Sequence, residues 1–134
     1  MLDSQGHVAE CTGENLFLVR LGSIVTPPDV HVLQGLTRDS VVHLARDLGF
    51  EVVSQPISRD QLYTADEVFV CGTAAEVIGL REIDFRTIGT GRTGPLTRSL
   101  QKAYHALVRG EHSRSEGWLT YVPAMNGRAR AANT

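Results

Sequence analysis

The spacing of the apolar residues changes along this chain of 134 residues and separates predicted strands from predicted helices. Strand-like composition opens the chain, broken at Thr12-Gly13 and at the turn "LGS", and the expected strands are residues 7–11, 14–20 and 23–26. From Leu36 up to Gly49 the apolar residues recur at helical spacing, at Val41, Leu44, Ala45 and Leu48. The first third of the chain therefore predicts strands followed by a helix.

The rest of the chain continues this alternation. The pattern predicts a strand over 50–57, a short helix opened by a capping box at Ser58, and two strands on either side of Gly72. A Gly-rich loop then leads to Pro95 and a last helix, whose expected apolar face is Leu96, Leu100, Tyr104, Leu107 and Val108. We expect one α/β (α+β) domain over residues 1–122 and a disordered tail over 123–134.

Composition excludes several classes of partner and location. The net charge is −2 with both signs interleaved, which gives no support to a nucleic acid or a membrane surface as partner. The longest apolar runs have four residues, whereas a membrane-spanning helix needs roughly 20. The first residues lack the pattern of a signal peptide and the two cysteines form no CxxC pair, so we expect a cytoplasmic location. The five histidines show no ligand spacing, and no metal is assigned.

Three segments far apart in sequence end an apolar stretch in small or hydroxyl residues. They are "AECTGEN" (9–15), "LQGLTRD" (33–39) and "CGTAAE" (71–76). The second begins a predicted helix at Leu36 and Thr37, where free N–H groups and the positive helix end favour a phosphate. The third offers the hydroxyl of Thr73 and the N–H groups of Thr73 and Ala74 to a second anion or to the same phosphate.

Each segment also has a simpler interpretation when it is taken alone. Thr37 can be an ordinary helix N-cap, "GTAAE" a bulge, and Glu10 an exposed carboxylate at a strand end. Arg38 can reach a phosphate, pair with Asp39 or extend into solvent. The order and spacing of all three segments favour one shared site.

Together the three segments resemble the class IV (fold-type IV) pyridoxal-phosphate aminotransferases. The run E-C-T-G-E-N-L-F, "IVT" (24–26) and "LQGLTR" (33–38) carry this resemblance. Within the class, "GENLF", "TPP", "GLTRDSV", "LYTADEVF", "GTAAEV" and "GPLT" are similar to branched-chain amino-acid aminotransferases, over about Leu2 to Trp118. The resemblance implies the large domain of these enzymes, a mixed β-sheet or pseudo-barrel with flanking helices.

The resemblance also implies a role for individual residues. The implied binding residues for pyridoxal 5′-phosphate are Glu10, Leu33, Leu36, Thr37 and Thr73, and those for the substrate carboxylate are Thr73 and Ala74. Glu10 would pair with the protonated pyridine nitrogen and keep it cationic, because an opposite charge favours the charged form. Leu33 would pack on one face of the ring, and the other three cofactor residues would hold the phosphate. Glu14 is given only a structural role in its loop.

The sequence departs from the family at three places. Gln34 replaces a common proline, and Cys11, expected to be a small buried residue, replaces a glycine. The Schiff-base lysine of the family lies upstream of the glutamate matched by Glu10, and none of the nine residues before Glu10 is a lysine. Lys102, the one lysine of the chain, is expected to be solvated on the last helix. No catalytic residue is therefore assigned, and we expect a fragment without the lysine region and the N-terminal small domain.

The resemblance favours one function and leaves alternatives open. The favoured function is the cofactor-binding portion of a branched-chain aminotransferase, which when intact moves the amino group of leucine, isoleucine or valine to 2-oxoglutarate. The chain alone is expected to be inactive, with an N-terminal half or a second copy of the chain as partner. The alternatives are a non-catalytic module for pyridoxal phosphate or another phosphorylated small molecule, and a fragment of a D-amino-acid aminotransferase or aminodeoxychorismate lyase.

Overall fold

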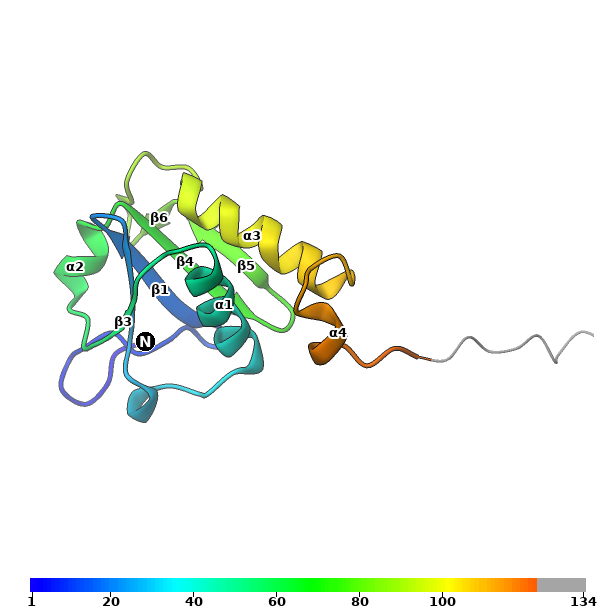
Figure 1. The fold of residues 1–134 in the computed structure, drawn as a ribbon. Helices are drawn as coiled ribbons and strands as arrows, with labels where there is room; N and C mark the ends of the chain where they lie inside the picture. The colour runs from blue at the N-terminus through cyan, green and yellow to red at the C-terminus, as the bar shows by residue number, and fades with distance from the viewer. Residues whose placement is uncertain (123–134) are drawn as a thin grey trace, which may run out of the picture.

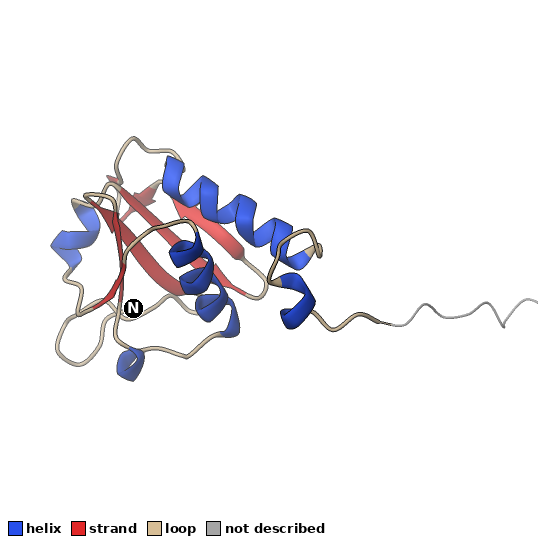
Figure 2. Cartoon of the chain, in the orientation of Figure 1, coloured by secondary structure: helices blue, strands red, loops and turns tan. Residues whose placement is uncertain are grey.

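The computed structural model describes residues 1–122, whose strands form one five-stranded sheet and one small hairpin (Figures 1 and 2). The strands of the sheet are β1 (Asn15–Arg20), β2 (Ser23–Thr26), β3 (Val52–Ser54), β4 (Glu67–Gly72) and β5 (Glu76–Leu80), and the hairpin consists of β6 (Glu82–Ile83) and β7 (Arg86–Thr87). The strand order in the sheet is β3-β2-β1-β4-β5. The β2–β3 pair is parallel and the other three neighbouring pairs are antiparallel. This mixed sheet with flanking helices confirms the expected fold class.

Helices cover both faces of the sheet. The helical elements are the 3-10 turn η1 (Asp29–His31), α1 (Leu36–Asp47), α2 (Arg59–Tyr63), α3 (Pro95–Val108) and α4 (Ser115–Trp118). The two long helices α1 and α3 pack on one face, and α2 packs on the other with the N-terminal segment (Figure 1). None of the helices within residues 1–122 has the length and the apolar character that a bilayer crossing requires.

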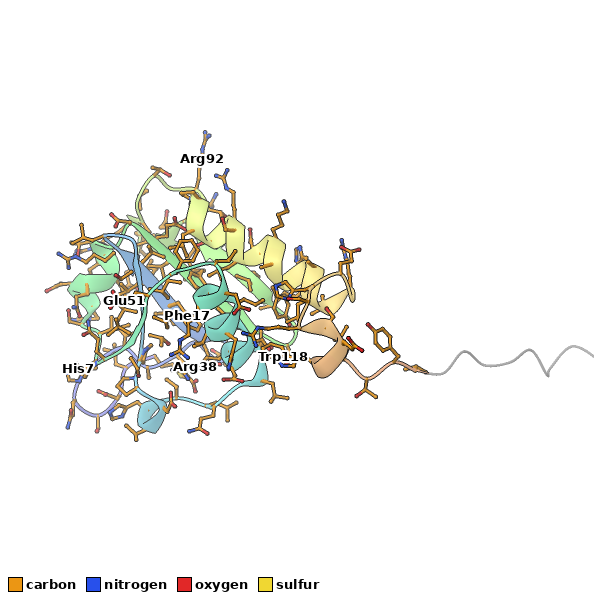
Figure 3. The ribbon with its side chains drawn as sticks, viewed as in Figure 1. His7, Phe17, Arg38, Glu51, Arg92 and Trp118 are labelled. Atoms are coloured by element: carbon orange, nitrogen blue, oxygen red, sulfur yellow. The ribbon has the colours of Figure 1, made fainter. Side chains whose placement is uncertain are left out.

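The central strands β1 and β4 are buried on both faces. Phe17 and Phe69 lie opposite each other in register and point toward α1 and α3, where their rings stack with centroids 4.9 Å apart. Figure 3 shows Phe17 in the interior of the molecule. The alternate residues, such as Leu18 and Val68, contribute to the second core under α2. Burial on both faces explains why these strands carry runs of four apolar residues in place of a polar–apolar alternation.

Several predicted boundaries are wrong. Residues 7–11 form no strand. Val8 makes one isolated β-bridge to Leu2 and one to Ile57, and neither bridge extends into a ladder. The strand predicted over 50–57 is reduced to β3. Val108 is 42% exposed, since the buried stripe of α3 passes through Leu107 and the next residue turns away from it.

Other sequence predictions have a clear outcome. The capping box at the start of α2 is confirmed, because the Ser58 side chain accepts from the Gln61 N–H while the Gln61 side chain accepts from the Ser58 N–H. The hairpin β6–β7 and the short helix α4 were not predicted. The expected disordered tail, 123–134, lies outside the described residues.

A buried carboxylate attaches α3 to the sheet. Glu67, the first residue of β4, is 8% exposed and receives three hydrogen bonds at the first turn of α3. Its Oε1 accepts from the Leu96 N–H at 3.0 Å, and its Oε2 accepts from the N–H and the hydroxyl of Thr97 at 2.8 and 2.6 Å. Because α3 has no capping side chain of its own, Glu67 supplies the negative charge that a helix N-terminus favours.

We expect Glu67→Gln to lower the free energy of unfolding by about 1–3 kcal/mol, because an amide lacks the charge and turns an N–H toward other donors. Urea denaturation monitored by circular dichroism measures this change. Glu82→Gln, at an exposed position on β6, is the matched control and should stay within about 0.5 kcal/mol of the parent chain. Equal stability of the two variants would contradict the capping role.

Candidate functional site

The side chain of Asn15 connects two of the three predicted segments. Asn15 is buried at the start of β1, and its Nδ2 donates to Oε2 of Glu10 at 3.0 Å and to the carbonyl oxygen of Leu33 at 2.9 Å. The N–H of Leu33 donates to the same Glu10 oxygen at 3.0 Å. One oxygen of the half-buried Glu10 carboxylate is therefore held by two donors, one from β1 and one from the loop before α1. The interpretation of Glu10 as a free, exposed carboxylate is wrong.

Two glycines allow the segments to approach closely. A Cβ at Gly35 would lie 2.7 Å from Oδ1 of Asn15, and a Cβ at Gly72 would lie 2.9 Å from the carbonyl oxygen of Gly13. Both distances are too short for a side chain, so only glycine fits without a local shift. Because β4 pairs with β1, and Asn15 lies opposite Cys71, the third segment also reaches the start of β1. The structure thus brings all three segments together.

The N-terminus of α1 has no capping side chain. Gly35 is the N-cap residue, because its carbonyl accepts the first helical hydrogen bond from Asp39. Thr37 lies inside the first turn and is buried, so its interpretation as the N-cap is wrong. The first N–H groups of a helix have no partner within the helix, and together with the helix dipole they favour an anion. The exposed Leu36 and the buried Thr37 carry these N–H groups.

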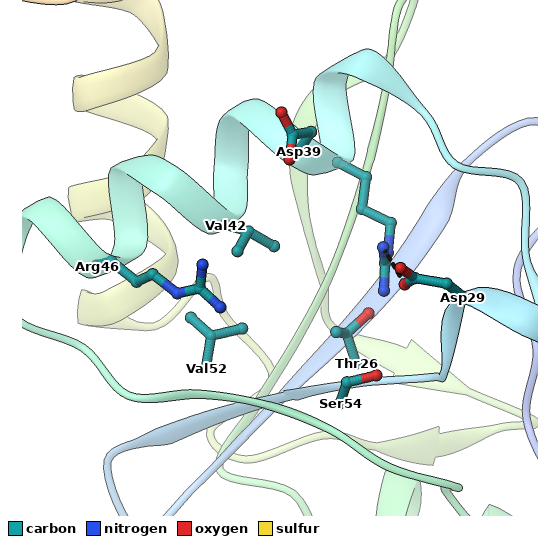
Figure 4. A pocket seen from close by; sticks show the side chains of 8 residues that line it. Thr26, Asp29, Asp39, Val42, Arg46, Val52 and Ser54 are labelled. Atoms are coloured by element: carbon teal, nitrogen blue, oxygen red, sulfur yellow. Dashed lines mark ion pairs between the residues drawn. The ribbon is translucent and has the colours of Figure 1, made fainter.

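Arg38 is structural. Its Nη1 pairs with Oδ1 of Asp29 at 2.7 Å and its Nη2 donates to the carbonyl oxygen of Pro27 at 3.0 Å. Arg38 therefore pairs with Asp29 in place of Asp39, and both of its terminal nitrogens already have partners within the chain. The ion pair connects the first turn of α1 to the chain that follows β2 (Figure 4).

Three hollows border these residues. A hollow of about 70 Å³ is lined by Glu10, Cys11, Thr12, Gly13, Glu14, Asn15 and Leu33. A second, of about 270 Å³, lies at the first turn of α1 and is lined by Asp29, Gln34, Gly35, Leu36, Arg38 and Asp39. A third, of about 250 Å³, lies between α1 and strands β2 and β3 and is lined by Thr26, Asp29, Arg38, Asp39, Val42, Arg46, Val52 and Ser54 (Figure 4). Since this third hollow contains none of the predicted site residues, we place the candidate site at the other two.

The remaining predicted site residues are exposed and lie in loops and turns. Leu33 is 74% exposed beside Glu10, and Thr73 and Ala74 are exposed in the turn between β4 and β5. Lys102 is exposed on α3, as expected. Within residues 1–122, no three metal-ligating side chains converge.

Neither cysteine offers a reactive thiolate to the site. Burial raises the pKa of the Cys11 thiol; the N-terminal ammonium opposes this, and the carboxylates of Glu14 and Glu10 add to it. Cys11 is half-buried and not fully buried as expected. Burial raises the pKa of Cys71 to about 12. Both thiols therefore stay protonated at neutral pH, and nucleophilic thiol chemistry is not supported.

Comparison with known proteins gives a consistent result. The family model "Amino-transferase class IV" matches residues 1–83. A probable branched-chain-amino-acid aminotransferase of Aquifex aeolicus is 51% identical over 124 residues, covering 91% of this chain and 40% of the relative. The branched-chain-amino-acid aminotransferase of Pseudomonas aeruginosa is 49% identical over 122 residues, again 91% of this chain and 40% of the relative. The chain thus spans about 40% of the length of these relatives.

Solved structures agree with the sequence relatives. The T.th. branched-chain amino acid aminotransferase, complexed with N-(5′-phosphopyridoxyl)-L-glutamate, superposes with a TM-score of 0.88 at 51% identity and covers 90% of this chain and 40% of that one. The same enzyme with pyridoxamine 5′-phosphate gives a TM-score of 0.87 at 52% identity, with the same coverage. At this identity the likeness extends to sequence as well as fold.

We expect Asn15→Ala to lower the free energy of unfolding by about 1–3 kcal/mol, because the Glu10 carboxylate and the Leu33 carbonyl each lose a donor. Gly35→Ala should also destabilise the chain, since its methyl group would collide with the Asn15 amide. The double variant, Asn15→Ala with Gly35→Ala, has no such collision. Its loss of unfolding free energy should therefore be smaller, by roughly 1 kcal/mol, than the sum of the losses in the two single variants. Urea unfolding of the four chains measures this coupling, and strict additivity would argue against the contact.

Proposed function

The chain belongs to the class IV aminotransferase family, and we propose that it is the cofactor-binding portion of a branched-chain amino-acid aminotransferase. The observation that carries this proposal is the convergence of Glu10, Asn15 and the N-terminus of α1 at one place. The identities of 51% and 49% to branched-chain enzymes support that class over other members of the family. Because the chain spans about 40% of those relatives, the complete reaction is proposed for the whole enzyme and not for these 134 residues.

The carboxylate of Glu10 fits the pyridine end of pyridoxal 5′-phosphate. Its Oε2 is engaged by Asn15 and Leu33, and no donor within residues 1–122 bonds to Oε1. Oε1 is therefore available to the ring N–H, and the negative charge of Glu10 favours a protonated ring. When bound, the protonated ring supplies an electron sink for the pair of electrons left at the substrate Cα.

The N-terminus of α1 fits the phosphate end of the same cofactor. We assign the phosphate to the N–H groups of Leu36 and Thr37, with the hydroxyl groups of Thr37 and Thr73 as added donors. The absence of a capping side chain on α1 supports this assignment, because those N–H groups still need an acceptor. The exposed side chain of Leu33 would cover one face of the ring.

The turn between β4 and β5 would bind the substrate. We assign the α-carboxylate of the amino acid to the N–H groups of Thr73 and Ala74, which lie on an exposed turn beside Gly72. The close approach of Gly72 to Gly13 brings this turn toward the loop that follows Glu10. The chain would therefore orient both the ring and the substrate.

The chain supplies binding groups at the site, and its one lysine lies elsewhere, on α3. Lys102 is exposed on α3 and makes no side-chain hydrogen bond within the described residues. We assign the amine chemistry to a lysine outside these 134 residues, supplied by an N-terminal half of the enzyme. In that assembly the substrates are leucine, isoleucine or valine together with 2-oxoglutarate.

We expect the purified chain to bind pyridoxal phosphate reversibly, and Glu10→Ala to weaken binding roughly tenfold or more, because a charge-assisted contact is lost. A spectroscopic titration of the cofactor measures both affinities, with Glu82→Gln as the matched control. Borohydride reduction followed by peptide mapping should reveal no stoichiometric adduct on Lys102. An adduct that disappears in Lys102→Arg would show instead that Lys102 serves as the amine.

We expect transamination between leucine and 2-oxoglutarate only when the chain is combined with the missing N-terminal part of a relative, such as the Pseudomonas aeruginosa enzyme. The lysine then comes from the added part and Glu10 from this chain, so the Glu10→Ala chain should restore no activity. A coupled assay for glutamate formation measures the outcome. Activity of the chain alone would contradict the proposal, and cofactor binding without any restored activity would favour the non-catalytic module.

A further inference from the structure

The turn that carries Thr73 and Ala74 ends in a residue with an unusual backbone. Glu76 has a φ of +56°, in the left-handed region that disfavours residues with a Cβ. It pairs with Gly72 in the last register position of the β4–β5 hairpin, so it closes residues 73–75 into the turn. Glycine or asparagine usually occupies a left-handed position of this kind. A glutamate there needs a compensating interaction.

The compensating interaction comes from α3. Nε2 of His105 lies 2.9 Å from Oε2 of Glu76, and Nε2 of Gln101 donates to the carbonyl oxygen of Val77 at 2.9 Å. His105 and Gln101 are four residues apart, so both project from one face of the helix. The helix thus holds two consecutive residues directly after the turn.

The helix is itself fixed in place. Its first turn is bound to Glu67, and Leu100 and Tyr104 are buried in the core on either side of Gln101. The opposite side of the turn is limited by Gly72, which lies against the carbonyl oxygen of Gly13. The turn is therefore held between the first segment and α3, and its conformation depends on both.

We propose that His105, through Glu76, is a positioning residue that orients the Thr73 and Ala74 donors toward the bound ligand. This inference rests on the proposed function, because it assigns the ligand groups to those donors. The hydrogen bond from His105 holds Glu76 in its left-handed conformation and thereby sets the direction in which the turn enters β5. Because both side chains are about half exposed, the pair acts on the geometry of the turn and contributes little to global stability.

Four variants of the 134-residue chain test this role. His105→Ala removes the donor, and Glu76→Ala removes the carboxylate while keeping a Cβ at the left-handed position. His105→Gln keeps an N–H donor on a side chain of similar reach and is the rescue variant. Lys102→Ala, at an exposed position on the same helix, is the matched control.

The readouts are amide hydrogen exchange at residues 76–78 in the free chain, where the turn enters β5, and the affinity for pyridoxal phosphate. We expect His105→Ala and Glu76→Ala to accelerate exchange and to weaken binding by roughly two- to fivefold, in line with an exposed pair. His105→Gln should stay close to the parent chain, and Lys102→Ala should match it. Retained dispersion of the amide NMR spectrum shows that each variant is folded.

The outcomes separate this inference from the proposed function. Unchanged exchange and affinity in both His105→Ala and Glu76→Ala would overturn the positioning role. Equal losses in His105→Gln and His105→Ala would also overturn it, since the donor would then be irrelevant. If the parent chain binds no pyridoxal phosphate, the proposed function fails, whatever the exchange rates show about the turn.

Discussion

The buried amide of Asn15 is the contact on which the arrangement of the site depends. It lies at the first residue of β1, donates to both Glu10 and Leu33, and limits the residue at position 35 to glycine. Glu10 belongs to the loop before β1, whereas Leu33 and Gly35 belong to the loop before α1. Removing the amide would leave a half-buried carboxylate and a backbone carbonyl each short of a donor, which costs more than the lost contact alone. The amide therefore specifies how the loops assemble and places the Glu10 carboxylate beside α1.

A second carboxylate plays a comparable part at the other end of β4. Glu67 binds the first turn of α3, and α3 in turn reaches back through Gln101 and His105 to the turn after β4. The two central strands thus have polar anchors at their ends and an apolar interior between them. This division is physically reasonable, because buried carboxylates are stable only where donors are directed at them. The interior around Phe17 and Phe69 needs no such donors and can pack on both faces.

The sequence predicted the elements whose pattern is local. The helical spacing from Leu36 and the apolar runs around Phe17 and Phe69 are properties of single segments, and α1, β1 and β4 follow from them. The wrong strand at 7–11 shows the limit of local patterns. A strand forms only where another segment pairs with it over several residues, whereas Val8 makes only isolated bridges to Leu2 and Ile57. The contacts of Asn15, Arg38 and Glu67 were not predicted for the same reason. Each of these side chains makes at least one hydrogen bond to a residue 11 or more positions away in the sequence. A local sequence pattern cannot identify such a distant partner. A polar residue at the start of an otherwise apolar strand was the one available signal, and it marks both Asn15 and Glu67.

The same contacts hold in place the groups that we propose as the binding half of a site. The Glu10 carboxylate, the free N–H groups of α1 and the turn at Thr73 are all fixed by interactions within residues 1–122. The Glu10 and Asn15 side chains have hydrogen-bond partners without a bound ligand, because Glu10 accepts from two donors and Asn15 donates to two acceptors. The proposed binding groups are therefore preorganised by the same hydrogen bonds that stabilise the domain. In the proposed function the amine comes from another segment, and that segment must be positioned as accurately as these groups, because the reaction depends on the geometry of the reacting atoms.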